Sequence, residues 1–197
     1  MRVPKDSPLI VAVIPAAGRS GRMGTPKQLL HVDGKPMLLG VVDALLGGGV
    51  DCVTIVASTA VRAVLPPLPP EVVVALNDKP DTAMIDSIRI GLDASPVGDG
   101  YVVCPSDAAR ITPADVRRCI NAFAKAPDRI VIATHNAKRG HPTLFPTSLV
   151  GVVHSPECDG GLNHLARSRP QLVREVACDS PGTVSNVNTP ADYEKLT

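Results

Sequence analysis

A glycine-rich, basic segment near the N-terminus carries the residues of this sequence best suited to chemistry. Between Ala16 and Lys27 the chain has three glycines, two small hydroxyl residues, two arginines and a lysine. Glycine lets the backbone come close to a ligand, so such a loop can direct its N–H groups at a phosphate. Arg19, Arg22 and Lys27 add the positive charge that an anionic ligand needs. The segment therefore predicts a phosphate-binding loop, and a basic surface turn is the plain alternative.

The glycine spacing excludes two common phosphate-binding motifs. Gly18, Gly21 and Gly24 do not match the fingerprint of dinucleotide-binding folds, and no Gly-Lys-Ser/Thr follows that would mark a Walker loop. Any nucleotide bound here is therefore held by another type of loop.

Polar residues also follow the other expected strands. Asn77 and Asp78 come after the strand expected at 71–76, and Asp107 comes after the strand at 100–104. Ligands of open α/β sheets bind beyond the carboxyl ends of the strands. An aspartate placed there beside a cationic loop can hold a divalent metal, and Mg²⁺ prefers such oxygen ligands. A simple turn residue is the alternative reading of Asp107.

The elements that must position these residues alternate along the chain. Strands are expected over 9–14, 52–57, 71–76, 100–104, 130–134, 143–145 and 172–177, and helices over 36–46, 61–65, 81–92, 146–153 and 161–167, from 113, and from 190. The clearest helix start has Thr112 as its cap, Pro113 at the first position and Asp115 in the first turn. This alternation predicts one α/β domain with a mostly parallel sheet and helices on both faces.

Composition limits the partners and the compartment. The 197 residues are 44% hydrophobic, enough for one core, and the formal charge of +1 gives no overall field for nucleic acid or a membrane surface. No apolar run is long enough for a bilayer, and no secretory signal is visible, so we expect a cytoplasmic protein. The five widely spaced cysteines indicate neither a disulfide framework nor a zinc site.

Three segments together resemble a known enzyme family. The run AAGRSGRMGTPKQLL (16–30) resembles the N-terminal motif of the nucleotidyltransferases that include the molybdenum cofactor cytidylyl- and guanylyltransferases. VVCPSDAARIT (102–112) resembles the family's Leu-Cys-Asp-Gln-Pro segment, and NVNTP (186–190) resembles its penultimate motif. The resemblance implies a Rossmann-like three-layer sandwich of the nucleotide-diphospho-sugar transferase type. It places a metal-binding aspartate on Asp107 and a second Mg²⁺ ligand on Asn188, for which a plain helix cap is the alternative.

The implied reaction joins a nucleoside monophosphate from CTP or GTP to a phosphorylated acceptor, for which molybdopterin is the first candidate, and releases pyrophosphate. The resemblance assigns catalytic charge stabilisation to Arg22, Lys27 and Asp107. It assigns nucleotide binding to Ala16, Ala17, Gly18, Arg19, Ser20, Lys27, Asn77 and Ser87. The segments 140–142 (GHP) and 160–167 (GGLNHLAR) are similar to the acceptor side of the family, which implies acceptor binding by Arg89, His141, Gly161 and Asn163.

The sequence departs from the family pattern at a few positions. Ala109 replaces a proline, and Ile85 and Asp86 replace two hydroxyl residues where relatives line the ligand pocket. An aspartate facing a triphosphate would repel it, so either Asp86 points elsewhere or the ligand differs. Pro26 and the GHP segment favour cytidylyl transfer, whereas the asparagines of NVNTP favour guanylyl transfer. A sugar or polyol phosphate acceptor stays open, as does a non-catalytic nucleotide- or pterin-binding protein or cofactor chaperone.

Overall fold

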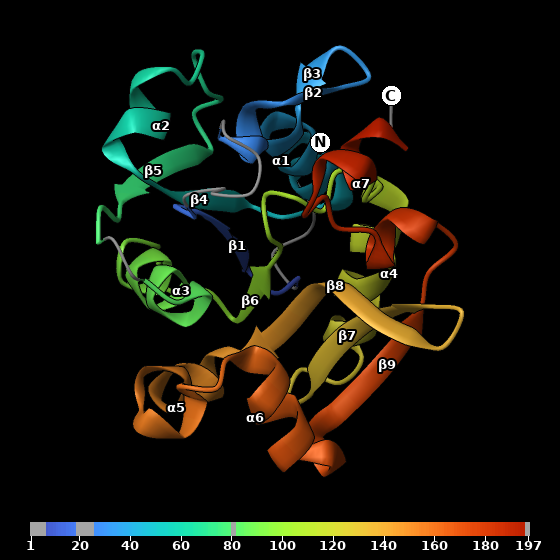
Figure 1. The fold of residues 1–197 in the computed structure, drawn as a ribbon. Coiled ribbons are helices and arrows are strands. Elements are labelled where there is room, and N and C mark those ends of the chain that lie inside the picture. Colours follow the sequence, from blue (N-terminus) through green and yellow to red (C-terminus); the bar gives the residue numbers. More distant parts are fainter. Residues whose placement is uncertain (1–6, 19–25, 80–81, 196–197) are drawn as a thin grey trace.

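A computed structural model describes residues 7–18, 26–79 and 82–195, and within them the chain forms a seven-stranded sheet in the order β5-β4-β1-β6-β8-β7-β9 (Figure 1). Neighbouring strands pair in parallel except at β8, which is antiparallel to both β6 and β7. The strands are β1 (Ile10–Ala16), β4 (Cys52–Ala57), β5 (Val72–Leu76), β6 (Gly100–Val103), β7 (Ile130–His135), β8 (Lys138–Pro146) and β9 (Val173–Ala177). The predicted mostly parallel sheet is confirmed.

Helices cover both faces of this sheet. The α-helices are α1 (Met37–Gly48), α2 (Thr59–Ala63), α3 (Met84–Asp93), α4 (Pro113–Ala124), α5 (Val150–His154), α6 (Leu162–Ser168) and α7 (Pro190–Glu194). Short 3-10 turns are η1 (Lys27–Leu29), η2 (Thr147–Leu149), η3 (Pro156–Cys158), η4 (Pro170–Leu172) and η5 (Pro181–Val184). Figure 1 shows α3, α5 and α6 on one side of the sheet and α1 and α4 on the other. The predicted three-layer α/β sandwich is therefore confirmed, and none of the helices in the described ranges is long and apolar enough to cross a membrane.

The first strand explains why the sheet needs both layers. Ile10, Ala12 and Ile14 belong to the core on the side of α1 and α4, whereas Val11 and Val13 belong to the core on the side of α3. A strand buried on both faces reads as a continuous apolar run, which is how the sequence predicted it. Burial of this strand from both sides fixes the position of Ala17 and Gly18, which follow it.

Local signals set several helix starts as expected. The hydroxyl of Thr112 accepts a hydrogen bond from the Asp115 N–H at 3.2 Å, which caps α4. Thr189 and Asp192 form a reciprocal capping box at the start of α7, and the hydroxyl of Thr189 holds the pKa of Asp192 below its usual value. Thr189 therefore fixes where the chain leaves the 186–188 segment and enters α7.

Two features of the sheet region differ from the sequence expectation. Residues 31–36 form a small hairpin of β2 (His31–Val32) and β3 (Lys35–Pro36), turned by Asp33 and Gly34 at φ of 52° and 79°. An Asp-Gly pair is a strong signal for such a turn. The strand expected at 143–145 begins already at Lys138, because a tight turn through Asn136 and Ala137 at positive φ pairs β8 with β7.

Candidate functional site

The candidate site lies where the order of the strands reverses. From β1 the chain moves outward to β4 and β5, and then returns to place β6 on the other side of β1. Open α/β sheets bind ligands at the carboxyl edge next to such a switch point, and here residues 15–18 after β1 and 105–107 after β6 line one cavity. Gly18 follows β1 and Asp107 follows β6, so the topology brings the two predicted segments together.

Two adjoining cavities open at this edge. The first has a volume of about 170 Å³ and is lined by residues 15–18, 27–28, 82–84, 87 and 105–107. The second has a volume of about 300 Å³ and is lined by residues 17–18, 26, 28, 58, 60–61 and 77–79. Ala17, Gly18 and Gln28 line both cavities, so the two cavities are neighbours at the edge of the sheet.

A lysine and three oxygen atoms form the charged centre of the site. The Nζ of Lys27 lies 2.5 Å from Oδ2 of Asp107, 3.0 Å from the carbonyl oxygen of Val187 and 3.1 Å from Oδ1 of Asn188. The charged pair is strong because Asp107 is buried and the Lys27 side chain is only 21% exposed. The structure therefore brings together three residues that the sequence analysis selected from three distant segments.

The 186–188 segment is held in place on both sides. The N–H of Val187 donates to the carbonyl oxygen of Asp107 at 3.1 Å, and the N–H of Asn188 donates to Asp192 at 3.1 Å. The Val187 side chain is buried beside Val32 and Met37. Ala109, which replaces the family's proline, packs against the same small cluster. The carbonyl and amide oxygens beside Lys27 are therefore fixed by the surrounding fold.

The oxygen set around Lys27 suits a magnesium ion in composition. Asp107 contributes a carboxylate, Asn188 an amide oxygen and Val187 a carbonyl oxygen, all of them hard ligands. Oδ1 of Asp107 is also buried and finds no hydrogen-bond partner among the described residues, so a ligating atom is left over. The described ranges contain no group of three or more His, Cys, Asp or Glu side chains that could hold a metal. Such a sparse set fits Mg²⁺, which often takes only one or two protein carboxylates and completes its shell with phosphate and water.

Asn77 links the walls of the two cavities through hydrogen bonds of its side chain. Its side chain is buried, and Nδ2 donates to the hydroxyl of Thr82 and to that of Ser87, each at 3.0 Å. Its Oδ1 accepts from the N–H of Lys79 at 3.3 Å. Asn77 lines the second cavity and Ser87 the first, so this network sets how the start of α3 stands toward the loop after β5.

The carboxylate of Asp86, whose direction the sequence left open, caps its own helix and is not among the described residues that line the two cavities. Its Oδ2 accepts from the N–H of Ala83 at 2.9 Å, so the carboxylate folds back onto the N-terminus of α3. Ile85, the other departure, is buried in the core under α3. Neither residue lines the first cavity, so the acidic side chain does not face the space next to Lys27.

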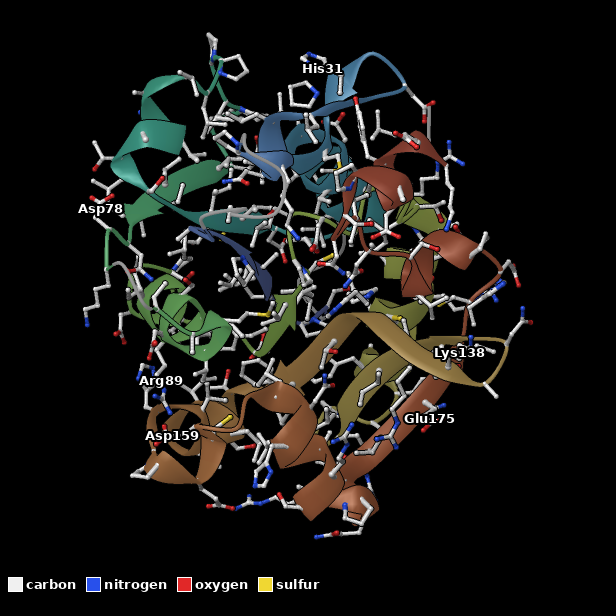
Figure 2. The ribbon with its side chains drawn as sticks, in the orientation of Figure 1. His31, Asp78, Arg89, Lys138, Asp159 and Glu175 are labelled. Carbon is white, nitrogen blue, oxygen red and sulfur yellow. The ribbon has the colours of Figure 1, made fainter. Side chains whose placement is uncertain are left out.

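A second acidic residue does line the site. Asp78 follows β5 and borders the second cavity (Figure 2). Its carboxylate accepts from the hydroxyl of Thr59 at 2.6 Å and from the N–H of Thr59 at 2.8 Å. These bonds hold the pKa of Asp78 below its usual value, so this wall of the second cavity carries a negative charge.

Of the residues expected to bind the acceptor, His141 lies near the charged centre and Arg89 does not. His141 of β8 lies near Asp107, and burial lowers the pKa of this histidine, with the charge of Asp107 partly opposing the shift. Arg89 of α3 donates to the carbonyl oxygens of Val153 and Ser155, each at 2.8 Å, and to Asp159 at 2.7 Å (Figure 2). Arg89 thus fastens α3 to the segment after α5 and does not line either cavity.

Gly161 and Asn163 lie at the N-terminus of α6, apart from the cavity next to β1 and β6 (Figure 1). Their region packs through Leu165 and Ala166 onto the face of the sheet that α3 covers. The described structure therefore gathers His141 near the charged centre and leaves Arg89, Gly161 and Asn163 outside the two cavities.

Some predicted site residues are not described by the structure, and one residue of the site was not predicted. Arg19, Ser20 and Arg22, three of the predicted loop residues, lie outside the described residues. The structure adds Gln28, which the sequence analysis missed: it is buried, lines both cavities, and donates from Nε2 to the carbonyl oxygen of Ala16 at 2.9 Å. The sequence held one sign of this role, because Gln28 is a polar residue between Lys27 and two leucines, at a position that an apolar core residue would otherwise take.

Comparison with known sequences identifies one family and several similar proteins. Residues 12–180 match the family described as MobA-like NTP transferase domain. A 2-C-methyl-D-erythritol 4-phosphate cytidylyltransferase of Frankia casuarinae is 34% identical over 165 residues, which are 81% of this chain and 56% of the relative. This chain thus spans little more than half the length of that relative. A protein of Rhodopirellula baltica named "Probable molybdenum cofactor guanylyltransferase" is 30% identical over 199 residues, 94% of this chain and 90% of the relative.

Solved structures agree with this result. The crystal structure of Rv0371c from Mycobacterium tuberculosis H37Rv superposes with a TM-score of 0.81 at 30% identity, covering 96% of this chain and 97% of that one. A crystal structure of Rv0371c in complex with manganese gives a TM-score of 0.78 at 27% identity, covering 96% and 98%.

Proposed function

The chain belongs to the MobA-like NTP transferase domain family, a family of nucleotidyltransferases, and from this membership we propose that it transfers a nucleoside monophosphate from CTP or GTP to a phosphorylated acceptor. Pyrophosphate is the second product. The observation that carries the proposal is the meeting of Lys27, Asp107 and Asn188 at the switch point of the sheet, beside a cavity walled by the chain that leaves β1. This arrangement provides a mobile cation and a set of oxygen ligands where phosphates would enter.

The proposed chemistry needs no covalent intermediate on the protein. The acceptor phosphate is ionised at neutral pH and attacks the α-phosphorus directly, so the protein has to align two anions and balance their charge. Lys27 is proposed to neutralise charge on the triphosphate as the bond to pyrophosphate breaks. The loop residues Gly18, Arg19, Ser20 and Arg22 are proposed to hold the triphosphate, in line with the family resemblance.

Asp107 and Asn188 are proposed to hold a magnesium ion. When bound, the ion would neutralise negative charge on the phosphates, as it does in other phosphoryl-transfer sites. The oxygen donors and the unpartnered Oδ1 of Asp107 support this assignment, as does the manganese in the related Rv0371c structure. A single carboxylate gives the protein part of the site a low charge, so the nucleotide is expected to supply several of the ligands.

The base and the acceptor are the finer part of the proposal. Ala16, Ala17, Asn77 and Ser87 are proposed to bind the nucleotide, because they line the two cavities beside Lys27. Molybdopterin is the first acceptor candidate, and a polyol phosphate is the second, since one relative carries the name of a guanylyltransferase for molybdenum cofactor and another that of a cytidylyltransferase for a polyol phosphate. His141 is proposed to contact the acceptor. For Arg89, Gly161 and Asn163 this role rests on the resemblance alone.

The test is pyrophosphate release with CTP and GTP, each with Mg²⁺ and with molybdopterin, 2-C-methyl-D-erythritol 4-phosphate or no acceptor. We expect release with one nucleotide and one acceptor only. Lys27→Ala and Asp107→Ala should each lower turnover at least about a hundredfold, or about 2.7 kcal/mol, because charge stabilisation is lost. Near-normal rates in either variant would refute the assignment. Tight nucleotide binding without release, under every acceptor, would instead favour a non-catalytic binding protein on this fold.

A further inference from the structure

Lys27 donates to Asp107 and Asn188, the two side chains proposed to hold the metal. We propose that Lys27 occupies the cation position of the site in the ligand-free chain, so that a divalent metal enters only together with the nucleotide. The ammonium has three N–H donors, and among the described residues it meets Oδ2 of Asp107, the carbonyl oxygen of Val187 and Oδ1 of Asn188. This inference rests on the proposed function, because it concerns the metal and nucleotide of that reaction.

The ammonium and a metal ion cannot share this position. Magnesium binds oxygen at about 2.0–2.1 Å, and Lys27 Nζ already lies 2.5 Å from Oδ2 of Asp107. An ion bound to Oδ2 and to Asn188 would therefore stand within a few ångströms of a positive charge, and both cations would repel each other. Binding the metal requires that Lys27 leave.

The charge of the site favours the lysine when no nucleotide is present. Asp107 is the one carboxylate among the described residues that line the first cavity, and the ammonium of Lys27 balances it. A divalent ion replacing Lys27 would leave one positive charge in excess over Asp107, and two if the displaced ammonium stays nearby, which makes binding of the metal alone weak.

A nucleoside triphosphate changes this balance. Its phosphates offer Lys27 new oxygen acceptors and offer the metal the remaining ligands, so both cations gain a partner when the nucleotide arrives. The four-carbon stem of lysine can follow the phosphates without backbone movement, because its ammonium is a flexible point charge. Lys27 therefore couples the two binding events, acting as a placeholder before the nucleotide and as a phosphate ligand after it.

The experiment measures Mn²⁺ binding to the nucleotide-free chain by electron paramagnetic resonance. Lys27→Met keeps the length of the stem and removes the charge, so we expect Mn²⁺ to bind at least about tenfold tighter than to the wild type. Lys79→Met is the matched control, because Lys79 lines the second cavity and loses the same charge away from the three oxygen atoms. Its Mn²⁺ affinity should stay within about twofold of wild type. Adding Asp107→Asn to Lys27→Met should remove the gain.

Equal or weaker Mn²⁺ binding by Lys27→Met would overturn the inference, as would an equal gain in Lys79→Met. A second readout uses the wild type, in case Lys27→Met does not fold: the side-chain ammonium signal of Lys27 in nitrogen NMR. Mg²⁺ alone at millimolar concentration should leave this signal in place, and a non-hydrolysable CTP or GTP analogue without metal should shift it. A shift by Mg²⁺ alone would contradict the inference. If the wild type releases pyrophosphate but Lys27→Met gains no Mn²⁺ affinity, this inference fails and the proposed function stands. If Lys27→Met gains Mn²⁺ affinity but the wild type releases no pyrophosphate, the inference stands and the proposed function fails.

Discussion

Replacing Asn77 by alanine tests whether the network under the two cavities holds the site together. The change removes the bonds from Nδ2 to Thr82 and Ser87 at 3.0 Å and the bond from Lys79 N–H to Oδ1 at 3.3 Å. The backbone bond from Asn77 to Ala57 remains. The start of α3 and the loop after β5 then lose their direct side-chain connection.

The expected loss of stability follows from these bonds. A typical intramolecular hydrogen bond contributes about 1 kcal/mol net, so three bonds give about 3 kcal/mol. Ser87 is only 3% exposed, so its hydroxyl is left without this partner in the interior, which keeps the cost at or above that value. For a chain of this size, the loss corresponds to a decrease in melting temperature of about 6–12 °C.

Urea unfolding and thermal melting would measure the effect, with Asn121→Ala as the matched control. Asn121 is exposed on α4, so the same truncation there should change the free energy of unfolding by less than about 0.5 kcal/mol. We also expect Asn77→Ala to weaken nucleotide binding, because Ser87 and Thr82 line the first cavity. A loss below about 1 kcal/mol, or one equal to that of Asn121→Ala, would refute the reasoning.

Three further predictions concern pH, packing and metal. Burial lowers the pKa of His141 from 6.5, so as pH falls the unfolded chain binds a proton at this histidine before the folded chain does. The free energy of unfolding should therefore decrease as pH falls below about 6.5, and it should decrease less steeply in His141→Gln. Equal slopes in the two proteins would contradict this prediction. Arg89→Ala should lower the free energy of unfolding by about 2–3 kcal/mol, because it loses the bonds to Val153, Ser155 and Asp159. Asp159→Asn should lower it by less than about 1 kcal/mol. Similar losses for the two variants in urea unfolding would contradict this prediction. EDTA should abolish pyrophosphate release and Mg²⁺ or Mn²⁺ should restore it, and activity that survives chelation would count against the metal site.

The parallel half of the sheet could be predicted because each strand carries its own signal. The strands from Ile10 to Val103 are apolar runs separated by helices and turns, and β1, β4 and β6 are buried almost throughout. β8 begins with Lys138, Arg139 and Gly140, residues that do not favour a strand on their own. Pairing with β7 and β6 stabilises that strand, and such tertiary pairing is not visible in a local pattern.

The site could be predicted as a meeting of segments but not as a set of contacts. Alternating strands and helices place the residues after β1 and β6 at one edge, which is why Lys27 and Asp107 could be expected together. The direct bond between them depends on side-chain conformations, and so does the direction of Asp86. Asp86 comes three residues after Ala83, which is the spacing of a helix cap. The sequence is equally compatible with a carboxylate that faces the ligand. In the structure the local cap bond is formed.

The central claim is that the chain transfers the nucleoside monophosphate itself, and phosphorus NMR of the reaction mixture tests it most directly. With the active pair of nucleotide and acceptor, we predict that the α-phosphorus appears in a new diphosphate linkage to the acceptor and that free pyrophosphate forms in equal amount. Formation of a nucleoside diphosphate with inorganic phosphate, or an unchanged spectrum with every pair, would contradict the claim.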